Sequence, residues 1–326
     1  MRLKNYILSY KLDISYFTKL IKDECLSVGF SKVGIAEVKY YSEDKSHLEN
    51  WLNKNRNASM HWMKNNQEKR TNISNYYSES KSVISVALNY FNGSPRDNHP
   101  PPYISNYASG VDYHIIIKSK LKKVLEKINN LDSSIHGFYC ADTSPIMEKA
   151  WAQRAGLGWI GKHTNLITKE FGSWVFLGEL IINKTLEYDK EFSQDLCGNC
   201  NLCIQTCPTD ALVDSFQLDA NKCISYVTIE KRGDFEEENK IDLNEWIFGC
   251  DICQDVCPWN IKFSSNTTEE DFKDRFDLKD KDYNYWEKLD EEEFRKIFKN
   301  SPVKRTKFSG LKRNVLLAKE QAQNDL

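Results

Sequence analysis

The chain has 326 residues, with 45 basic and 47 acidic side chains and a formal net charge of −2. A hydrophobic content of 40 %, of which aromatic residues make up a large part, excludes wholesale disorder. No run approaches the roughly 18 apolar residues that a membrane helix needs, and the amino-terminal residues hold no secretory apolar stretch. These features predict a cytoplasmic protein with no membrane association, built as two domains or as one domain with a substantial addition.

Residues 1–190 alternate helical and extended patterns. Apolar residues between Tyr16 and Val28 lie near one face of a helix, and the helical pattern returns over Ile115–Ile128 and Ile146–Ala155. The segment Asn92–Pro102 holds four of the eight prolines and is expected to be a loop. Apolar runs predict strands at four places: Phe30–Ala36, Val83–Tyr90, Ile135–Cys140 and Trp174–Ile182. This alternation predicts an α/β (α+β) domain over residues 1–190.

The rest of the chain divides by composition. A cysteine-rich module spans residues 191–262. The stretch Asn266–Phe294 carries twelve acidic and five basic residues, whereas the stretch from Ser301 onward carries six basic and two acidic residues. We therefore expect residues 263–326 to form a short α-helical C-terminal region that ends in a basic tail.

Eight of the ten cysteines fall between Cys197 and Cys257. In a chain of this length without an export signal, clustered thiols hold metal more often than they form disulfides. Cys25 and Cys140, which lie outside the cluster, are interpreted as buried free thiols.

The spacing of these cysteines is that of bacterial ferredoxins. Cys197-x-x-Cys200-x-x-Cys203-x-x-x-Cys207-Pro is a 4Fe–4S run whose last cysteine binds the other cluster in two-cluster proteins. Zinc is the alternative, but four-cysteine zinc sites use paired C-x-x-C units. The spacing rule assigns the ligands to two clusters: Cys197, Cys200, Cys203 and Cys257 to the first, and Cys207, Cys223, Cys250 and Cys253 to the second. Such clusters carry electrons, so residues 1–190 must hold either the reacting centre or a docking surface for another redox protein.

The segment from Asp142 to Ile167 is the densest special stretch of the first domain. Asp142 follows a predicted strand and precedes a helix that begins at a proline, so its carboxylate either caps that helix or donates a proton at the edge of a cofactor cavity. Gly156, Gly158 and Gly161 permit close backbone approach to a bulky ligand. Neither a dinucleotide fingerprint nor a P-loop is present.

The order of motifs along the chain resembles the epoxyqueuosine reductase family, cobalamin and iron–sulfur enzymes that carry out the last step of queuosine synthesis on tRNA. The resemblance runs from about residue 30 to residue 318. It is carried by these segments: Glu68–Arg70, Tyr107–His114, Asp142–Ile167, Gly172–Glu179, both cysteine runs, Cys223–Tyr226, Ser301–Arg305 and Gly310–Asn314.

The resemblance implies that the protein reduces epoxyqueuosine to queuosine at the wobble position of tRNA, with cobalamin and two 4Fe–4S clusters as cofactors. Asp142 matches the proton donor of the family, a role for which we expect burial against the corrin to raise its pKa. Positions that match cobalamin contacts are Arg70, Asp142, Leu166, Leu177 and Ser225, although the two leucines could be ordinary core. Ser105 lies where some relatives have a cysteine near the cobalt, which argues against a required thiol ligand.

Other residues of these motifs have no role fixed by the sequence. His114 belongs to the Asp112-Tyr113-His114 hallmark of the family, although each of its residues could be structural. His163 is expected to pack near the site rather than to bind a metal.

The expected partners are tRNA bearing epoxyqueuosine in its anticodon stem-loop and a low-potential electron donor, and the chain is expected to be a monomer. Local basic clusters predict the tRNA contacts: Lys231, Arg232, Lys304, Arg305, Lys307, Lys312 and Arg313. Two alternative functions stay open on the sequence. One is a cobalamin-dependent enzyme resembling reductive dehalogenases, and the other is a ferredoxin-type electron carrier.

Overall fold

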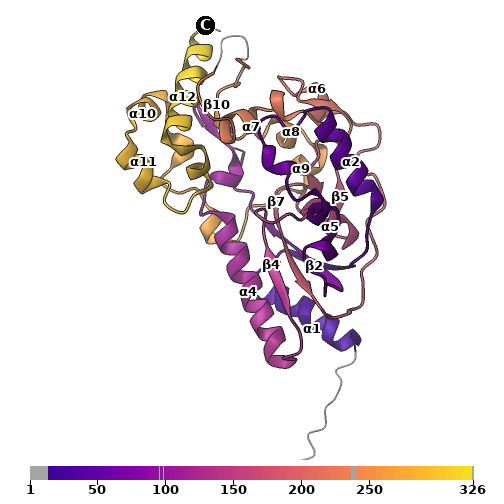
Figure 1. Ribbon diagram of the computed structural model, residues 1–326. Helices are drawn as coiled ribbons and strands as arrows, with labels where there is room; N and C mark the ends of the chain where they lie inside the picture. The colour runs from indigo at the N-terminus through magenta and orange to yellow at the C-terminus, as the bar shows by residue number, and fades with distance from the viewer. Residues whose placement is uncertain (1–13, 95, 98, 236–239, 325–326) are drawn as a thin grey trace, which may run out of the picture.

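The computed structural model describes residues 14–94, 96–97, 99–235 and 240–324 (Figure 1). Residues 1–13 of the expected first domain and residues 325–326 of the expected tail lie outside the described residues. Within the described ranges, no helix has both the length and the apolar character to cross a bilayer.

A four-stranded antiparallel sheet forms the centre of the first half of the chain, in the order β1-β2-β7-β4. Its second strand is buried along its whole length, because successive side chains point to opposite faces and both faces are covered. Ile84 and Val86 enter one core and Val83 and Ala87 enter the other. The four predicted strands are confirmed, with these bounds: β1 Lys32–Glu37, β2 Ser82–Asn89, β4 Gly137–Cys140 and β7 Val175–Ile182.

Helices cover both faces of this sheet. On one face α1 (Ile14–Ser27) and α4 (Tyr113–Leu131) bury an apolar stripe in the same core as Ile84. On the other face α5 (Glu148–Arg154) packs Trp151 against the sheet. The three predicted helices of this domain are thereby confirmed. Two further helices, α2 and α3, span Ser42–Asn53 and Gln67–Thr71.

The cysteine-rich segment consists of short elements joined by turns. Pro258 stands at the first position of α9, directly after Cys257, where its missing N–H costs no hydrogen bond. The helices are α6 Leu202–Gln205, α7 Ile224–Ile229, α8 Ile252–Asp255 and α9 Pro258–Phe263. Its strands β8 Leu212–Asp214 and β9 Gln217–Leu218 pair with each other, and β5 Trp159–Ile160 pairs with β6 Leu166–Ile167 earlier in the chain, after α5.

The C-terminal helices gather beside β10 (Trp246–Phe248), as Figure 1 shows. This strand pairs in parallel with β3 (Tyr103–Ile104), so one core contains side chains from all three expected segments, including Tyr103, Trp246 and Trp286. The boundaries at residues 190 and 262 therefore stay predictions. The helices are α10 Tyr283–Lys288, α11 Glu291–Ile297 and α12 Lys307–Asn324. Short 3-10 turns occur at His61–Met63, Ile73–Asn75, Asn106–Ala108, Ala220–Lys222, Glu270–Phe272, Leu278–Asp280 and Pro302–Thr306.

Candidate active site

Three cavities meet at Tyr107 and Asp142, which line all of them. Their volumes are about 1020, 530 and 260 Å³. The largest lies between the turn after β4 and the start of the basic tail, and the second is bordered by cysteines of the ferredoxin-like segment. We call these three neighbouring cavities, which share Tyr107 and Asp142, the central recess.

Asp142 enters the recess from a strained turn that follows β4. Its backbone φ is 59°, a left-handed value that few residues other than glycine adopt, and its backbone N–H donates a short hydrogen bond to the carboxyl of Glu148. The side chain is 63 % exposed toward the recess. Met147, not Asp142, occupies the cap position of α5 and makes no side-chain cap bond. The capping interpretation is therefore wrong, because the turn puts five residues between this carboxylate and the helix.

His114 connects the Asp142 carboxylate to a second one. Its Nε2 lies 3.2 Å from Asp142 Oδ2, and its Nδ1 lies 2.6 Å from Asp112 Oδ1. Asp112 is fixed as the cap of α4, since it also accepts a bond from the backbone N–H of His114. Burial alone would lower the pKa of His114, but the hydrogen bonds to Asp112 and Asp142 outweigh burial and raise it to about 9. The imidazole is thus a cation at neutral pH.

In the chain alone, without a corrin against it, the pKa of Asp142 is lowered and not raised. The hydrogen bond from His114 lowers the pKa of Asp142, and this effect exceeds the opposing effect of burial. At neutral pH the transferable proton therefore lies on His114, next to the carboxylate that faces the recess.

The residues expected to contact a corrinoid all line the recess. Arg70 lines the largest cavity, Leu166 and Leu177 line the smallest, and Ser105 and Ser225 line the cavity bordered by cysteines. Within the described part of the chain, the buried Nε of Arg70 has no hydrogen-bond partner, and burial lowers the pKa of its guanidinium.

Two of the polar residues around this recess are buried and make hydrogen bonds to other residues of the protein. Ser105 is 2 % exposed, and its hydroxyl donates to Asp251 at 2.5 Å. His163 is equally buried, and its Nδ1 accepts from the backbone N–H of Asn165 at 3.1 Å. Burial, with the nearby charge of Lys149, lowers the pKa of His163 to about 4, so it is neutral. These contacts favour the packing interpretation of His163.

The first set of cysteines comes together from two distant parts of the chain. Burial raises the pKa of Cys203 to about 11, and the charges of Cys197, Cys257 and Cys200 add to the rise. Cys203 and Cys257 are buried, whereas Cys200 is exposed. Lys162 is bonded to the turn that contains Cys197 and Cys200: its ammonium group donates to the carbonyl oxygens of Gly198 and Cys200, at 2.6 and 2.9 Å.

The second set lies against the central recess. Cys207, Cys223, Cys250 and Cys253 all line the cavity that also contains Asp142. Burial raises the pKa of Cys253 well above its usual value, and Cys223 is the first charge that adds to this effect.

The seven basic residues expected to bind tRNA fall into two groups. Lys304 and Arg305 line the largest cavity, and Lys307 is exposed at the start of α12. Arg305 also pairs with Glu230 at 2.8 Å. The other four take part in hydrogen bonds within the protein itself. Arg232 and Arg313 donate to backbone carbonyls, Lys312 donates to the carbonyls at the end of α10, and Lys231 offers its own carbonyl to Arg313.

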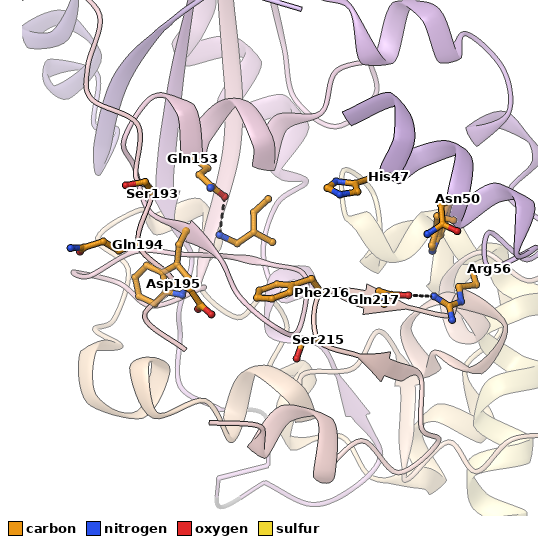
Figure 2. Close-up of a pocket in the computed structure, with 13 residues that line it drawn as sticks. His47, Asn50, Arg56, Gln153, Ser193, Gln194, Asp195, Ser215, Phe216 and Gln217 are labelled. Atoms are coloured by element: carbon orange, nitrogen blue, oxygen red, sulfur yellow. Dashed lines mark hydrogen bonds between the residues drawn. The ribbon is translucent and has the colours of Figure 1, made fainter. Parts of the chain in front are cut away.

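A separate cavity of about 560 Å³ lies beside the first cysteine set (Figure 2). Asp195, which lines it, accepts from the backbone N–H of Cys197 at 2.8 Å, and Arg56 donates to Gln217 at 2.5 Å across its floor. None of the residues expected to act in the site is among those that line it. The central recess, not this cavity, is therefore the candidate active site.

Sequence reasoning left the roles of Asp112 and His114 open, and it did not single out Tyr107, Trp62 or Glu148 for the site. The signal for the first two was the Asp112-Tyr113-His114 motif, which places a capping carboxylate and an imidazole on the first turn of α4. No local pattern marks Trp62, which lines the recess with Arg305 5.5 Å from its ring centre.

Two family models match the chain. Residues 70–143 match "Epoxyqueuosine reductase QueG, DUF1730", and residues 196–260 match "4Fe-4S double cluster binding domain". The second match confirms the prediction of a two-cluster ferredoxin-like segment.

Curated relatives match over nearly the full chain. The epoxyqueuosine reductase of Cyclobacterium marinum is 42 % identical over 95 % of this chain and 99 % of its own length. That of Escherichia coli is 36 % identical over 95 % of this chain and 83 % of its own length.

Solved structures show the same fold. A crystal structure of epoxyqueuosine reductase with an epoxyqueuosine-modified stem-loop of tRNA-Tyr has a TM-score of 0.86 and 25 % identity, over 94 % of this chain and 81 % of that one. The Streptococcus thermophilus structure has a TM-score of 0.82 and 28 % identity, over 92 % of this chain and 80 % of that one. The mixed α/β fold with a cluster domain in its second half is thus confirmed.

Proposed function

The chain belongs to the epoxyqueuosine reductase family, the oxidoreductases of tRNA queuosine biosynthesis, and we propose how its residues carry out that reaction. The reaction removes the epoxide oxygen of epoxyqueuosine in tRNA as water and leaves an alkene, which consumes two electrons and two protons. The family membership sets aside a plain electron carrier and a dehalogenase-like enzyme. The observation that carries our proposal is one recess lined both by Asp142 and by four cysteines of the cluster domain.

The recess suits a corrinoid in size and lining. Its three cavities share Tyr107 and Asp142, and the smallest has apolar walls at Leu166 and Leu177. The unpartnered Nε of Arg70 offers a buried donor to a polar edge of such a group. When bound here, the corrinoid would supply a strongly reducing, nucleophilic cobalt. Arg70, Ser105, Asp142, Leu166, Leu177 and Ser225 would hold it.

We assign the eight cysteines to two clusters by spacing and by position. Cys197, Cys200, Cys203 and Cys257 would bind the first cluster, and Cys207, Cys223, Cys250 and Cys253 would bind the second. The second set lines the recess, whereas the first set includes the exposed Cys200. A low-potential electron donor would therefore dock on the side of the first set, because single electrons must reach the recess from outside.

The chain's own residues supply the proton. Asp112 orients His114, and the charged His114 passes a proton from Nε2 to Asp142 Oδ2 across 3.2 Å. Asp142 then faces the epoxide oxygen from the edge of the recess and protonates it as it departs. Because the raised pKa of His114 keeps it charged at neutral pH, His114 can supply a proton to Asp142 after each transfer.

The substrate base would reach Asp142 through the largest cavity. Anticodon-loop bases are unpaired, so turning one into a buried site costs little. The wall of this cavity offers Trp62 for stacking and Lys304 and Arg305 for phosphate contacts. Lys231, Arg232, Lys307, Lys312 and Arg313 remain proposed contacts of the surrounding stem-loop. We further propose that the protein acts as a monomer in the cytoplasm, where tRNA is found.

Replacement of Asp142 by Asn tests this assignment. Asparagine keeps the size and polarity of the side chain but cannot donate a carboxyl proton. We expect turnover to fall by about 10²- to 10⁴-fold with corrinoid binding retained, as measured by nucleoside analysis of tRNA and by corrinoid absorbance. Turnover close to that of the wild type would remove Asp142 from the proton path.

A further inference from the structure

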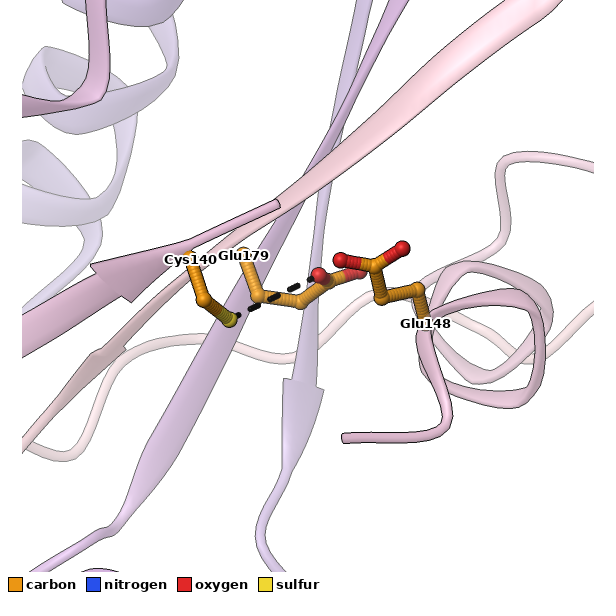
Figure 3. A group of neighbouring side chains, drawn as sticks. All are labelled: Cys140, Glu148 and Glu179. Atoms are coloured by element: carbon orange, nitrogen blue, oxygen red, sulfur yellow. Dashed lines mark hydrogen bonds between the residues drawn. The ribbon is translucent and has the colours of Figure 1, made fainter. Parts of the chain in front are cut away.

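A group of buried acidic side chains (Figure 3) is joined to Asp142 by the hydrogen bond from the backbone N–H of Asp142 to Glu148. Cys140 ends β4, Glu179 lies in β7 and Glu148 begins α5, and one ligand atom from each lies within 4.8 Å of the other two. Cys140 and Glu179 are fully buried, and Glu148 is half-buried. In Figure 3 the carboxyl group of Glu179 lies between the sulfur of Cys140 and the carboxyl group of Glu148.

The register of the sheet creates this cluster. Cys140 pairs with Glu179 across β4 and β7, so both side chains leave the sheet on the same face. That face also carries Leu177 and Ile181 and packs against α5. Glu179 therefore places a carboxyl group in an apolar core, with Cys140, at 4.0 Å, and Glu148 beside it.

No cation among the described residues pairs with Glu179. Burial, and then the neighbouring Glu148, raise the pKa of Glu179 well above its usual value. Burial, and then the charge of Asp142, raise the pKa of Glu148 to about 7. The other charged or titratable groups that act on the pair are Arg70, Tyr113, His114, Cys140, Asp142 and Lys149. The pair therefore keeps at least one proton at neutral pH, because two carboxylates this close in a core cannot both be charged.

Glu148 also connects the pair to the reacting centre. It accepts the backbone N–H of Asp142 and lines the 260 Å³ cavity together with the side chains of Asp142, Tyr113 and Lys149. This cavity has room for water molecules and polar groups to bind them, so a proton can move between the two carboxyl groups through it.

We propose that Glu148 and Glu179 form a proton reserve that supplies the second of the two protons consumed in each turnover. This role rests on the proposed function. The epoxide loses both C–O bonds and gains two electrons, which the low-potential donor provides. The first proton reaches the oxygen from His114 through Asp142. The second leaves Glu148, passes to Asp142 and completes the water molecule, and His114 and the pair then each take one proton from solvent.

The variants Glu148→Gln and Glu179→Gln test the reserve. Glutamine at 148 keeps an oxygen that accepts the Asp142 N–H but holds no transferable proton. We expect Glu148→Gln to slow single turnover at least tenfold with an unchanged KM for the tRNA stem-loop, and to remove the inflection near pH 7 from the rate profile. Glu179→Gln should keep that inflection but move it to lower pH, because an amide donor stabilises the Glu148 carboxylate. A wild-type rate and profile in Glu148→Gln would overturn the proposal.

A measurement without turnover separates this inference from the proposed function. Infrared difference spectra of the cluster-loaded chain, taken without corrinoid, should show a protonated carboxyl band at pH 7 that Glu148→Gln and Glu179→Gln alter. Absence of this difference would mean that the pair is ionised and would overturn the reserve. If the band is present but the wild type makes no queuosine, the proposed function is wrong. The role of the pair as a proton donor in that reaction is then overturned as well, although the pair is protonated.

Discussion

His114 determines how the site handles protons. It lies between two carboxylates, and its ring distances of 2.6 and 3.2 Å to Asp112 and Asp142 give it two anionic partners. One imidazolium between two carboxylates keeps its own proton and keeps both acids ionised. The site therefore starts its cycle with the proton one step behind the acid that meets the substrate.

This arrangement predicts how stability depends on pH. The pKa of His114 is raised to about 9 in the folded chain, against about 6.5 in an unfolded one. Its charged form therefore stabilises the fold fully below about pH 6.5, and this contribution disappears as pH rises through 9. The difference in Tm between the cluster-loaded wild type and His114→Gln should be largest at pH 6 and shrink toward pH 9.5.

His136 supplies the matched control for that series. It is an exposed histidine just before β4, and within the described residues its hydrogen bonds are both made by its backbone: its N–H donates to the side-chain oxygen of Asn183, and its carbonyl accepts from the backbone N–H of Asn183. His136→Gln should follow the wild-type curve across the same range. A Tm difference for His114→Gln that stays constant with pH would contradict a charged His114.

At the scale of elements, the two Cys-Pro turns decide how the cluster domain is connected. Cys257 belongs to the second run in sequence, yet its charge acts on Cys203 of the first run. Cys203→Ser and Cys257→Ser should therefore cause the same defect: about four irons per chain instead of eight, with the same cluster signal lost in electron paramagnetic resonance.

Two further variants complete that test. Cys25→Ser replaces a buried thiol of α1, far along the chain from the cluster domain, and should leave eight irons bound. Cys250→Ser should remove the other signal. If Cys257→Ser instead lost the same signal as Cys250→Ser, the proposed exchange of cysteines between runs would be wrong.

The start of the basic tail is the element that we expect to contact the phosphate groups of tRNA. Lys304 and Lys307 are exposed at the 3-10 turn and at the first residue of α12. Replacing both by Ala should weaken binding of the tRNA stem-loop and flatten the plot of log K against log salt by about 1.4, or about 0.7 per contact with single-stranded nucleic acid.

Lys122→Ala with Lys123→Ala serves as the control for the tail. Both lysines are exposed on α4, outside the lining of the recess. This pair removes the same charge from the chain and should leave the salt slope unchanged. Equal slopes for the tail variant and the wild type would show that the tail does not contact phosphate.

At the scale of the whole molecule, sequence patterns were sufficient to predict those features that are determined by residues close together in the chain. Strands buried on both faces appear as continuous apolar runs, as at Val83–Tyr90, and cluster ligands appear as a fixed spacing. The site depends on contacts between distant segments. Only the register of β4 with β7 brings Cys140 to Glu179, and only the turn at Asp142 brings that residue to His114.

The same limit explains the expectations that the structure changed. The expectation of a raised pKa at Asp142 took account of burial. It did not take account of the charged imidazole of His114, which α4 places next to Asp142. The basic residues were expected to bind tRNA because of their charge alone. The guanidinium of Arg313, however, donates hydrogen bonds to the backbone carbonyls of Val227, Lys231 and Gly233. Each correction comes from a partner that lies far away in the sequence.

The central claim is that a corrinoid in the recess meets both the cluster domain and the proton path of this chain. The most direct measurement is anaerobic incubation of the chain, loaded with eight irons and corrinoid and supplied with a chemical reductant, with epoxyqueuosine-bearing tRNA, followed by nucleoside analysis. We predict that queuosine replaces epoxyqueuosine, and that omission of corrinoid or of iron abolishes the conversion. A fully loaded, reduced chain that leaves epoxyqueuosine unchanged, or a chain that converts it equally well without corrinoid, would contradict the account.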